Sequence, residues 1–177
     1  MNEIRKLHLY TGTGKGKTTA AMGLALRALG HGERALIAQF LKDGRSGELK
    51  AFERFENAVL WPGETVKTFV FRMTPQQREE ARAGQTRQAL ALAEAIAAKK
   101  PELIVLDELA VALALGMVDE PAARVLLDAA LQSGETVVTG RTAPGWLEAR
   151  ADYVSVITAK RHPYETEGLT ARRGVEW

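Results

Sequence analysis

The chain has 177 residues, of which 46% are hydrophobic and 26% charged, and its formal net charge is +2. These values predict a soluble globular domain and exclude a disordered chain, which would combine low hydrophobicity with a large net charge. They give no support for a nucleic-acid partner, and the lack of cysteine excludes disulfides, thiolate zinc sites and thiol catalysis.

The N-terminal segment has no apolar stretch long enough for a signal peptide, and no later run approaches the roughly 18 apolar residues of a membrane span. We therefore expect a cytoplasmic protein with no membrane partner. Residues 7–10 predict a first strand, and residues 17–29 predict a helix that ends at two glycines. Residues 35–40 predict a second strand, and short strands are expected near residues 58–60 and 69–71.

The next helix has a clear start. Thr74 can act as the N-cap, Pro75 suits the first helical position, and Gln77 completes a capping box. We expect this helix to reach residue 98, because Pro101 then prevents its continuation.

The second half of the chain continues to alternate strands with helices. Strands are predicted over residues 103–106, 136–139 and 153–157, and helices over residues 119–131 and 144–150. Asp119 is the expected N-cap of the longer helix, and residues 159–177 are expected to form an irregular tail. Apolar strands separated by helices indicate an α/β fold, with a mostly parallel sheet and helices on both faces.

A glycine-rich segment joins the first strand to the first helix and is the strongest signal in the sequence. Its residues are Thr11, Gly12, Thr13, Gly14, Lys15, Gly16, Lys17, Thr18 and Thr19. Alternating glycines let the backbone wrap an anion with its amides pointing inward, and the helix dipole adds to the attraction. Lys17 supplies a charge for the outer phosphates, and Thr18 can offer its hydroxyl to magnesium. We therefore expect a single P-loop NTPase-like domain over residues 1–177; the alternative is a glycine-rich turn without a ligand.

Asp107 and Glu108 follow the predicted strand over residues 103–106. A carboxylate at the end of a buried strand can hold magnesium directly or through water, and the metal then neutralises polyphosphate charge. The alternative is an acidic turn exposed to solvent, since apolar residues followed by two acids also occur by chance. Behind a phosphate loop, the pair predicts a metal site.

Short motifs follow one another in a characteristic order along nearly the whole chain. They are residues 10–21, Gln39-Phe40-Leu41-Lys42, Ser46-Gly47-Glu48, Leu106-Asp107-Glu108, Thr139-Gly140-Arg141, Ala143-Pro144, Ala151-Asp152, His162-Pro163-Tyr164 and Gly174-Val175-Glu176-Trp177. In this order they resemble the P-loop ATP:corrinoid adenosyltransferases, which act on cob(I)alamin or cob(I)yrinic acid a,c-diamide. The usual phosphate-loop pattern has a glycine where this chain has Thr11, and its shift to Gly12 is typical of that family.

The resemblance implies a transferase that moves the 5′-deoxyadenosyl group of ATP to the Co(I) centre of a corrinoid and releases triphosphate. The product would serve adenosylcobalamin biosynthesis or salvage. The protein needs no nucleophile of its own, so its tasks are to position the substrates and to stabilise the leaving group. Lys17 and Arg141 are the expected catalytic residues, with a surface role as an equal alternative for Arg141.

The resemblance also assigns binding residues. Magnesium or manganese is the expected cofactor, held by Thr18 and Glu108, with Asp107 as the alternative carboxylate. Gln39, Lys42 and Glu48 are expected to line the nucleotide pocket.

An apolar pocket that removes the lower axial ligand of cobalt is implied as well. Phe69 and Phe71 are its candidate lining residues, together with Trp61, and a position in the hydrophobic core is the alternative for each. His162 is not expected to bind cobalt, because the reaction favours the loss of axial ligands.

The partners implied besides ATP are a corrinoid (cobalamin or cobyrinic acid a,c-diamide), an electron-donor flavoprotein and a second copy in a homodimer. Two other functions remain open. One is a P-loop kinase or NTPase that acts on another small molecule, and the other is a nucleotide-dependent binding module. ATP consumption distinguishes the three, because they release triphosphate, ADP or nothing.

Overall fold

The computed structural model describes residues 4–44, 46–66 and 68–175. Their centre is a six-stranded sheet with the strand order β3-β2-β4-β5-β1-β6, in which all neighbouring strands run parallel. The strands are β1 (Leu7–Thr11), β2 (Ala35–Gln39), β3 (Ala58–Leu60), β4 (Leu103–Asp107), β5 (Glu135–Thr139) and β6 (Tyr153–Val156). The expected α/β class is therefore confirmed.

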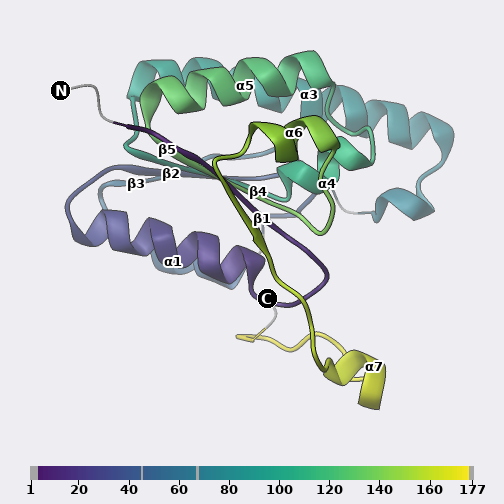
Figure 1. Ribbon diagram of the computed structural model, residues 1–177. Helices are drawn as coiled ribbons and strands as arrows, with labels where there is room; N and C mark the ends of the chain where they lie inside the picture. The colour runs from purple at the N-terminus through teal and green to yellow at the C-terminus, as the bar shows by residue number, and fades with distance from the viewer. Residues whose placement is uncertain (1–3, 45, 67, 176–177) are drawn as a thin grey trace.

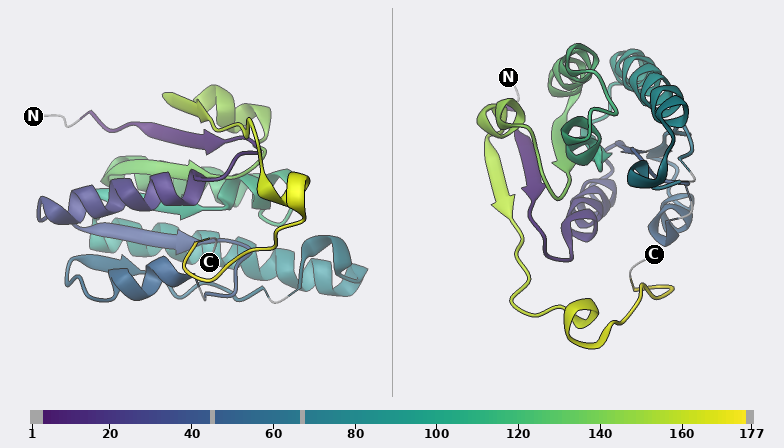
Figure 2. Two further views of the ribbon diagram at one scale, coloured as in Figure 1. Left: turned by 90° about the horizontal axis from the view of Figure 1, so that it is seen from below. Right: turned by 90° about the vertical axis from the view of Figure 1, so that its right-hand side faces the viewer.

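Helices cover both faces of the sheet. They are α1 (Lys17–Gly30), α2 (Gly47–Phe52), α3 (Pro75–Lys99), α4 (Leu109–Ala114), α5 (Glu120–Ser133), α6 (Gly145–Arg150), α7 (Pro163–Glu167) and the short 3-10 helix η1 (Val70–Arg72). α1 packs on one face, and α3 and α5 lie side by side on the other (Figures 1 and 2). Among the described residues, no helix combines the length and the apolar character that a bilayer crossing requires.

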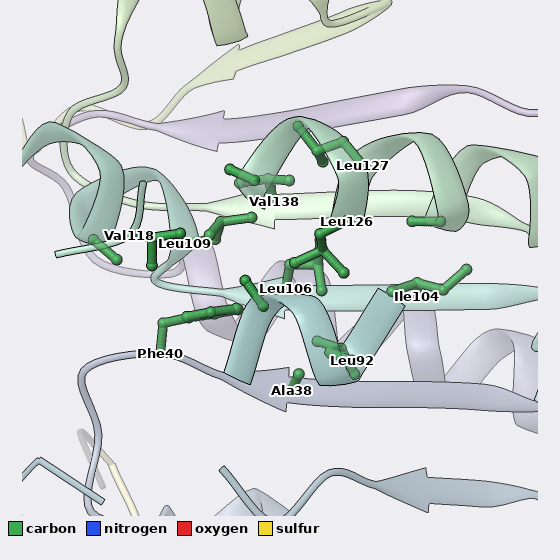
Figure 3. Packing of buried hydrophobic residues seen from close by; sticks show 14 of the residues in the cluster. Ala38, Phe40, Leu92, Ile104, Leu106, Leu109, Val118, Leu126, Leu127 and Val138 are labelled. Carbon is green, nitrogen blue, oxygen red and sulfur yellow. The ribbon is translucent and has the colours of Figure 1, made fainter. Parts of the chain in front are cut away.

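Two apolar clusters hold these layers together. The larger cluster lies between the sheet and the α3–α5 layer, and it includes the fully buried Phe40, Leu92, Ile104 and Leu126 (Figure 3). The smaller cluster packs α1 against the opposite face of the sheet, with Ala25 fully buried. Burial on both faces explains why the central strands are apolar along their whole length.

The predicted start of α3 is confirmed in detail. The amide of Gln77 donates to Thr74 Oγ1 at 3.2 Å, and the amide of Thr74 donates to Gln77 Oε1 at 3.0 Å. At the start of α5, Asp119 holds the predicted N-cap position but makes no side-chain capping bond. Its carboxylate instead accepts hydrogen bonds from Arg82 at 2.8 and 2.6 Å. The predicted N-cap position is therefore confirmed, but the prediction that the Asp119 side chain caps the helix is wrong.

The other long elements are confirmed with small shifts at their ends, and the differences concern short segments. The strand predicted near residues 69–71 is wrong, because this segment forms the 3-10 helix η1. α2, α4 and α7 were not predicted; each has only five or six residues, too few for a helical periodicity. The tail is therefore not wholly irregular, since α7 lies within it.

Candidate functional site

The candidate site lies at the edge of the sheet where β1, β2, β4 and β5 end. The strands are parallel, so their carboxyl ends meet at this edge, where α/β proteins bind ligands. β5 lies between β1 and β4 in the strand order. Thr139, at the end of β5, therefore lies between the phosphate loop (residues 11–18) and Asp107.

The phosphate loop packs closely against the chain that follows β6. The amide of Gly14 donates to the carbonyl of Ile157 at 2.8 Å, and the amide of Gly12 donates to the carbonyl of Arg141 at 3.2 Å. A Cβ at Gly12 would lie 2.4 Å from the Ile157 oxygen, so only glycine fits there. In this arrangement protein carbonyls accept the hydrogen bonds of these two amides.

The C-terminal part of the loop is more open. Gly16 has φ 116°, and a Cβ at this position would meet no atom within 4 Å. Gly16 is also the N-cap of α1, so the positive end of this helix is directed at the open side of the loop. The start of α1 is therefore better placed to bind an anion than the amides of Gly12 and Gly14 are.

Lys17 and Thr18 occupy the first turn of α1. Lys17 is buried, and its ammonium donates to the Gly14 carbonyl at 2.6 Å. Thr18 donates its hydroxyl proton to Asp107 Oδ1 at 2.8 Å. Lys17, predicted to bind phosphate, therefore contacts the loop, and Thr18, predicted to bind the metal, contacts the carboxylate of Asp107.

Asp107 is the centre of the site and is fully buried. Its Oδ1 accepts hydrogen bonds from Thr18 and from Thr139, the latter at 2.7 Å. Its Oδ2 accepts from Gln39 Nε2 at 3.1 Å and from Lys42 Nζ at 2.5 Å. The alternative of an exposed acidic turn is therefore wrong for this residue.

Glu108 sits beside Asp107 in a left-handed conformation with φ 62°, and its amide donates to Thr139 Oγ1 at 2.9 Å. Burial raises the pKa of its carboxyl above the ordinary value, and the neighbouring Asp107 charge raises it further. The cations Lys42, Lys17 and Arg141 oppose this rise in pKa. A cation close to Glu108 would therefore stabilise its ionised carboxylate, which burial and the charge of Asp107 disfavour.

Arg141 follows β5 and is exposed, and its carbonyl binds the start of the phosphate loop. Burial lowers the pKa of the Lys17 ammonium, and the charge of Arg141 lowers it further. Arg141 is therefore within electrostatic reach of the site. Its exposure is compatible with the surface role, so the alternative given for this residue stays open.

A magnesium ion fits this set of donors. No group of three or more His, Asp or Glu side chains within the described part of the chain is placed to hold a metal, but Mg²⁺ usually takes one or two carboxylates together with water and substrate phosphates. Thr18 gives its proton to Asp107, which leaves its oxygen lone pairs for a cation. Each carboxylate oxygen of Asp107 already accepts two hydrogen bonds. Thr18 and Glu108 are therefore better suited than Asp107 to coordinate a magnesium ion directly.

The structure brings Gln39 and Lys42 to the site as the resemblance implied. Gln39 Nε2 also reaches the Ser46 hydroxyl at 3.2 Å, while Gln39 Oε1 has no hydrogen-bond partner among the described residues. Gln39, Lys42 and Trp61 line a small cavity of about 40 Å³. The unpaired Oε1 can accept a bond from a ligand or from a water molecule.

The remaining predicted residues are more peripheral. Thr11 ends β1, Thr13, Lys15 and Thr19 are exposed along the loop and the start of α1, and Glu48 lies half-buried in the first turn of α2. Of the last motif, Glu176 and Trp177 lie outside the described residues.

Phe69 and Phe71 are 70% and 78% exposed, so the core alternative is wrong for both. Their rings stack with centroids 5.5 Å apart. Trp61 in contrast is half-buried and packs against the larger apolar cluster. η1, which carries Phe71, lies near the N-terminal end of α3 and apart from the phosphate loop (Figure 1), so the structure does not bring the aromatic pair to the nucleotide residues.

Four polar residues around the site were given no role from the sequence, although Ser46 and Thr139 belong to the motifs that carry the resemblance. Thr139 binds Asp107 and Glu108, and Ser46 binds Gln39. Gln85 and Gln88 bind the backbone after β2. Their spacing of three residues on a long helix indicated that both amides lie on one face, but it did not indicate which backbone groups they bind.

Comparison with known proteins gives a consistent result. The model of the family described as ATP:corrinoid adenosyltransferase BtuR/CobO/CobP matches residues 4–177. The chain is similar to the corrinoid adenosyltransferase of Pseudomonas aeruginosa, with 37% identity over 97% of this chain and 83% of the relative. It is also similar to the corrinoid adenosyltransferase CobA of Salmonella typhimurium, with 30% identity over 96% of this chain and 84% of the relative.

A solved structure supports the fold. The KaiC-like protein PH0186 of Pyrococcus horikoshii OT3 aligns with a TM-score of 0.55 over 88% of this chain and 73% of its own. The two sequences are 20% identical, so this likeness concerns the α/β architecture alone.

Proposed function

The chain belongs to the ATP:corrinoid adenosyltransferase family, and we propose that it transfers the 5′-deoxyadenosyl group of ATP to the Co(I) centre of a corrinoid. Membership makes it a transferase that adenosylates corrinoids; the donor, the cobalt state and the leaving group are the proposal. The observation that supports it most is the Asp107 cluster. There a phosphate-loop hydroxyl and the Lys42 ammonium meet one buried carboxylate at the edge of the sheet.

In the proposed reaction, the electron pair of Co(I) attacks C5′ of ATP. The cobalt–carbon bond forms, the C5′–oxygen bond breaks, and triphosphate leaves with the electron pair of that bond. Cobalt thereby becomes formally Co(III). The chain supplies no nucleophile, and the tasks of Lys17, Lys42 and Arg141 are to orient the triphosphate and to stabilise its charge.

We propose that magnesium, or manganese in its place, is held by Thr18 and Glu108 together with phosphate oxygens. When bound, the ion neutralises part of the polyphosphate charge. Asp107 fixes the Thr18 hydroxyl so that its lone pairs are presented to the cation. Thr139 holds both Asp107 and the Glu108 amide, and so it keeps the two acidic residues in one arrangement.

For the corrinoid, cobalamin or cobyrinic acid a,c-diamide, we propose contact with the Phe69–Phe71 pair. Two stacked aromatic rings that are mostly exposed present an apolar surface to water. Covering such a surface with the apolar face of a corrin ring is favourable. We further propose that a flavoprotein delivers the electrons that produce Co(I).

We also propose a homodimer that forms through β6. This strand is the last in the sheet and pairs with β1 along one edge. Tyr153, Val154 and Val156 are 53%, 41% and 61% exposed, and no charged side chain interrupts the strand. An exposed apolar edge strand is suited to pairing with another strand, and β6 of a second copy supplies one.

The experiment that tests the function incubates the purified chain with ATP, magnesium and a chemically reduced corrinoid without oxygen. We expect a light-sensitive cobalt–carbon product and the release of triphosphate. Release of ADP without a corrinoid product would instead indicate a kinase or NTPase, and ATP binding without turnover would indicate a binding module.

Lys17→Ala is the matched variant in this assay. The ammonium of Lys17 bonds only to the Gly14 carbonyl, three residues away in the loop, among the side-chain hydrogen bonds described, so its removal should leave the far-UV circular dichroism spectrum unchanged. Loss of one charge-stabilising contact typically slows turnover about 10²–10³-fold. Unchanged turnover would remove Lys17 from the mechanism.

A further inference from the structure

Helix α3 carries two buried glutamines, Gln85 and Gln88, on the face that packs toward the sheet. Gln85 is fully buried, and Gln88 is 4% exposed. Burying an amide is unfavourable unless its donor and acceptor are bonded. Their spacing of three residues places both amides on the same side of the helix, where they bond to the same two segments of backbone.

The first of these segments is the turn that follows β2. The amide of Leu41 donates to Gln85 Oε1 at 3.0 Å, and Gln88 Nε2 donates to the Gln39 carbonyl at 3.0 Å. Leu41 has φ 54°, a left-handed conformation that is rare for a leucine. The two bonds therefore hold a strained turn, and this turn directs Lys42 onto Asp107.

The second segment surrounds Glu64. Its amide donates to Gln88 Oε1 at 2.7 Å, and its carbonyl accepts from Gln85 Nε2 at 3.1 Å. Two open surface pockets of about 270 and 480 Å³ flank this attachment, and Glu64 lines both of them. Glu64 is therefore a point at which the chain between β3 and α3 is fixed to α3.

The two segments are also bonded to each other. The amide of Val66 donates to the Lys42 carbonyl at 3.2 Å. From Val66 the chain leads to η1, which carries the exposed Phe71. Gln85 and Gln88 therefore bond both to the turn that precedes Lys42 and to the segment that leads toward the aromatic pair.

We infer that Gln85 and Gln88 form a clamp that positions Lys42 on Asp107 and ties the Phe69–Phe71 segment to the same turn. The inference rests on the proposed function, because it assigns Lys42 to the nucleotide. Both glutamines are positioning residues. They act on nucleotide binding through Lys42, and they act on the corrinoid side through Glu64.

A double-mutant cycle tests this coupling. The dissociation constant of MgATP is measured by titration calorimetry for the wild type, Gln88→Met, Lys42→Met and the double variant, and again with Gln85→Met. Methionine keeps the length of the side chain and removes its hydrogen bonds. We expect each clamp variant alone to bind MgATP about tenfold more weakly, because one buried hydrogen bond left unmade has an effect of this size. In the Lys42→Met background, the same substitutions should cause no further loss of affinity.

Gln76→Met is the control, because Gln76 lies on the same helix, is exposed, and bonds only to the exposed Glu80 among the interactions described. Its affinity should equal that of the wild type. An unchanged dissociation constant in folded clamp variants, or full additivity with Lys42→Met, would overturn the inference. If the wild type itself bound no MgATP, the proposed function would fail instead.

A second measurement does not depend on the variants folding. In the wild type, the amides of Leu41 and Glu64 donate to the buried glutamines, so both should be strongly protected in hydrogen exchange followed by NMR. Fast exchange at these two amides would contradict the clamp whatever the variants do, because the amides would then not be held by buried acceptors.

Discussion

Asp107→Ala is the substitution that most directly tests how the site is held together. The carboxylate accepts hydrogen bonds from Thr18, Thr139, Gln39 and Lys42. After the substitution Thr18 and Lys42 can turn toward water, because both are partly exposed. Gln39 and Thr139 cannot, since they are 8% and 0% exposed, and their donors are left without Asp107.

The expected cost follows from these two donors. A buried donor without a partner costs about 1–3 kcal/mol. Gln39 keeps a bond to Ser46 at 3.2 Å, so its contribution lies near the lower end of that range, whereas Thr139 loses the acceptor for its hydroxyl proton. We therefore expect the free energy of unfolding to fall by about 3 kcal/mol, close to the cost of breaking a buried ion pair from one side.

Urea denaturation followed by circular dichroism measures this loss. Asp107→Asn is the matched control, because it keeps one acceptor oxygen and should lose less than half as much stability. Glu108→Gln, at the next residue, leaves all four bonds to Asp107 in place. A loss below about 1 kcal/mol in the alanine variant would refute the view that unsatisfied buried donors control stability here.

Three further predictions concern the loop, the pH dependence and the dimer. A Cβ at Gly14 would lie 2.8–2.9 Å from the backbone at residues 157–158, so Gly14→Ala should cost about 1–3 kcal/mol in chemical denaturation. Burial raises the pKa of Glu108, so the folded state keeps the carboxyl proton to higher pH than the unfolded chain does. The stability of the folded state therefore falls as the pH rises above the ordinary pKa of a glutamate. Glu108→Gln should therefore gain stability relative to the wild type as the pH rises above the ordinary carboxyl pKa, and a stability difference that did not change with pH would contradict the raised pKa of Glu108. Val156→Lys should convert the proposed dimer to a monomer in light scattering, and a dimer that persisted would place the interface elsewhere.

Much of the fold was predictable because its signals are local. The capping box of α3 needs only Thr74 and Gln77, and the structure confirms both of its bonds. The failure at Phe69–Phe71 has a physical reason as well. Alternating aromatic and branched residues favour a strand only where a neighbouring strand is present to pair with, and this segment forms η1 outside the sheet.

The site was predictable to the extent that its residues follow strand ends. Thr18 and Asp107 are 89 positions apart and nevertheless form a hydrogen bond, as expected for a phosphate loop and an acidic strand end in one parallel sheet. Gln85 and Gln88 could not be assigned, because their partners lie on the turn after β2 and at Glu64, and no local pattern encodes those distances. The use of the Gly12 and Gly14 amides by protein carbonyls depends in the same way on the path of the chain beyond β5 and β6.

The distribution of charge at the site has a consequence for the proposed reaction. Lys17, Lys42 and Arg141 act on the carboxylate of Glu108. These cations lie at the edge of the sheet that is proposed to bind phosphate, while η1, which carries Phe71 of the pair proposed for the corrinoid, lies near the N-terminal end of α3 (Figure 1). During transfer, negative charge moves from the cobalt to the departing triphosphate. Cations placed at the phosphate end therefore interact more strongly as the C5′–oxygen bond breaks than before it breaks, and only interactions that strengthen in this way accelerate the chemical step.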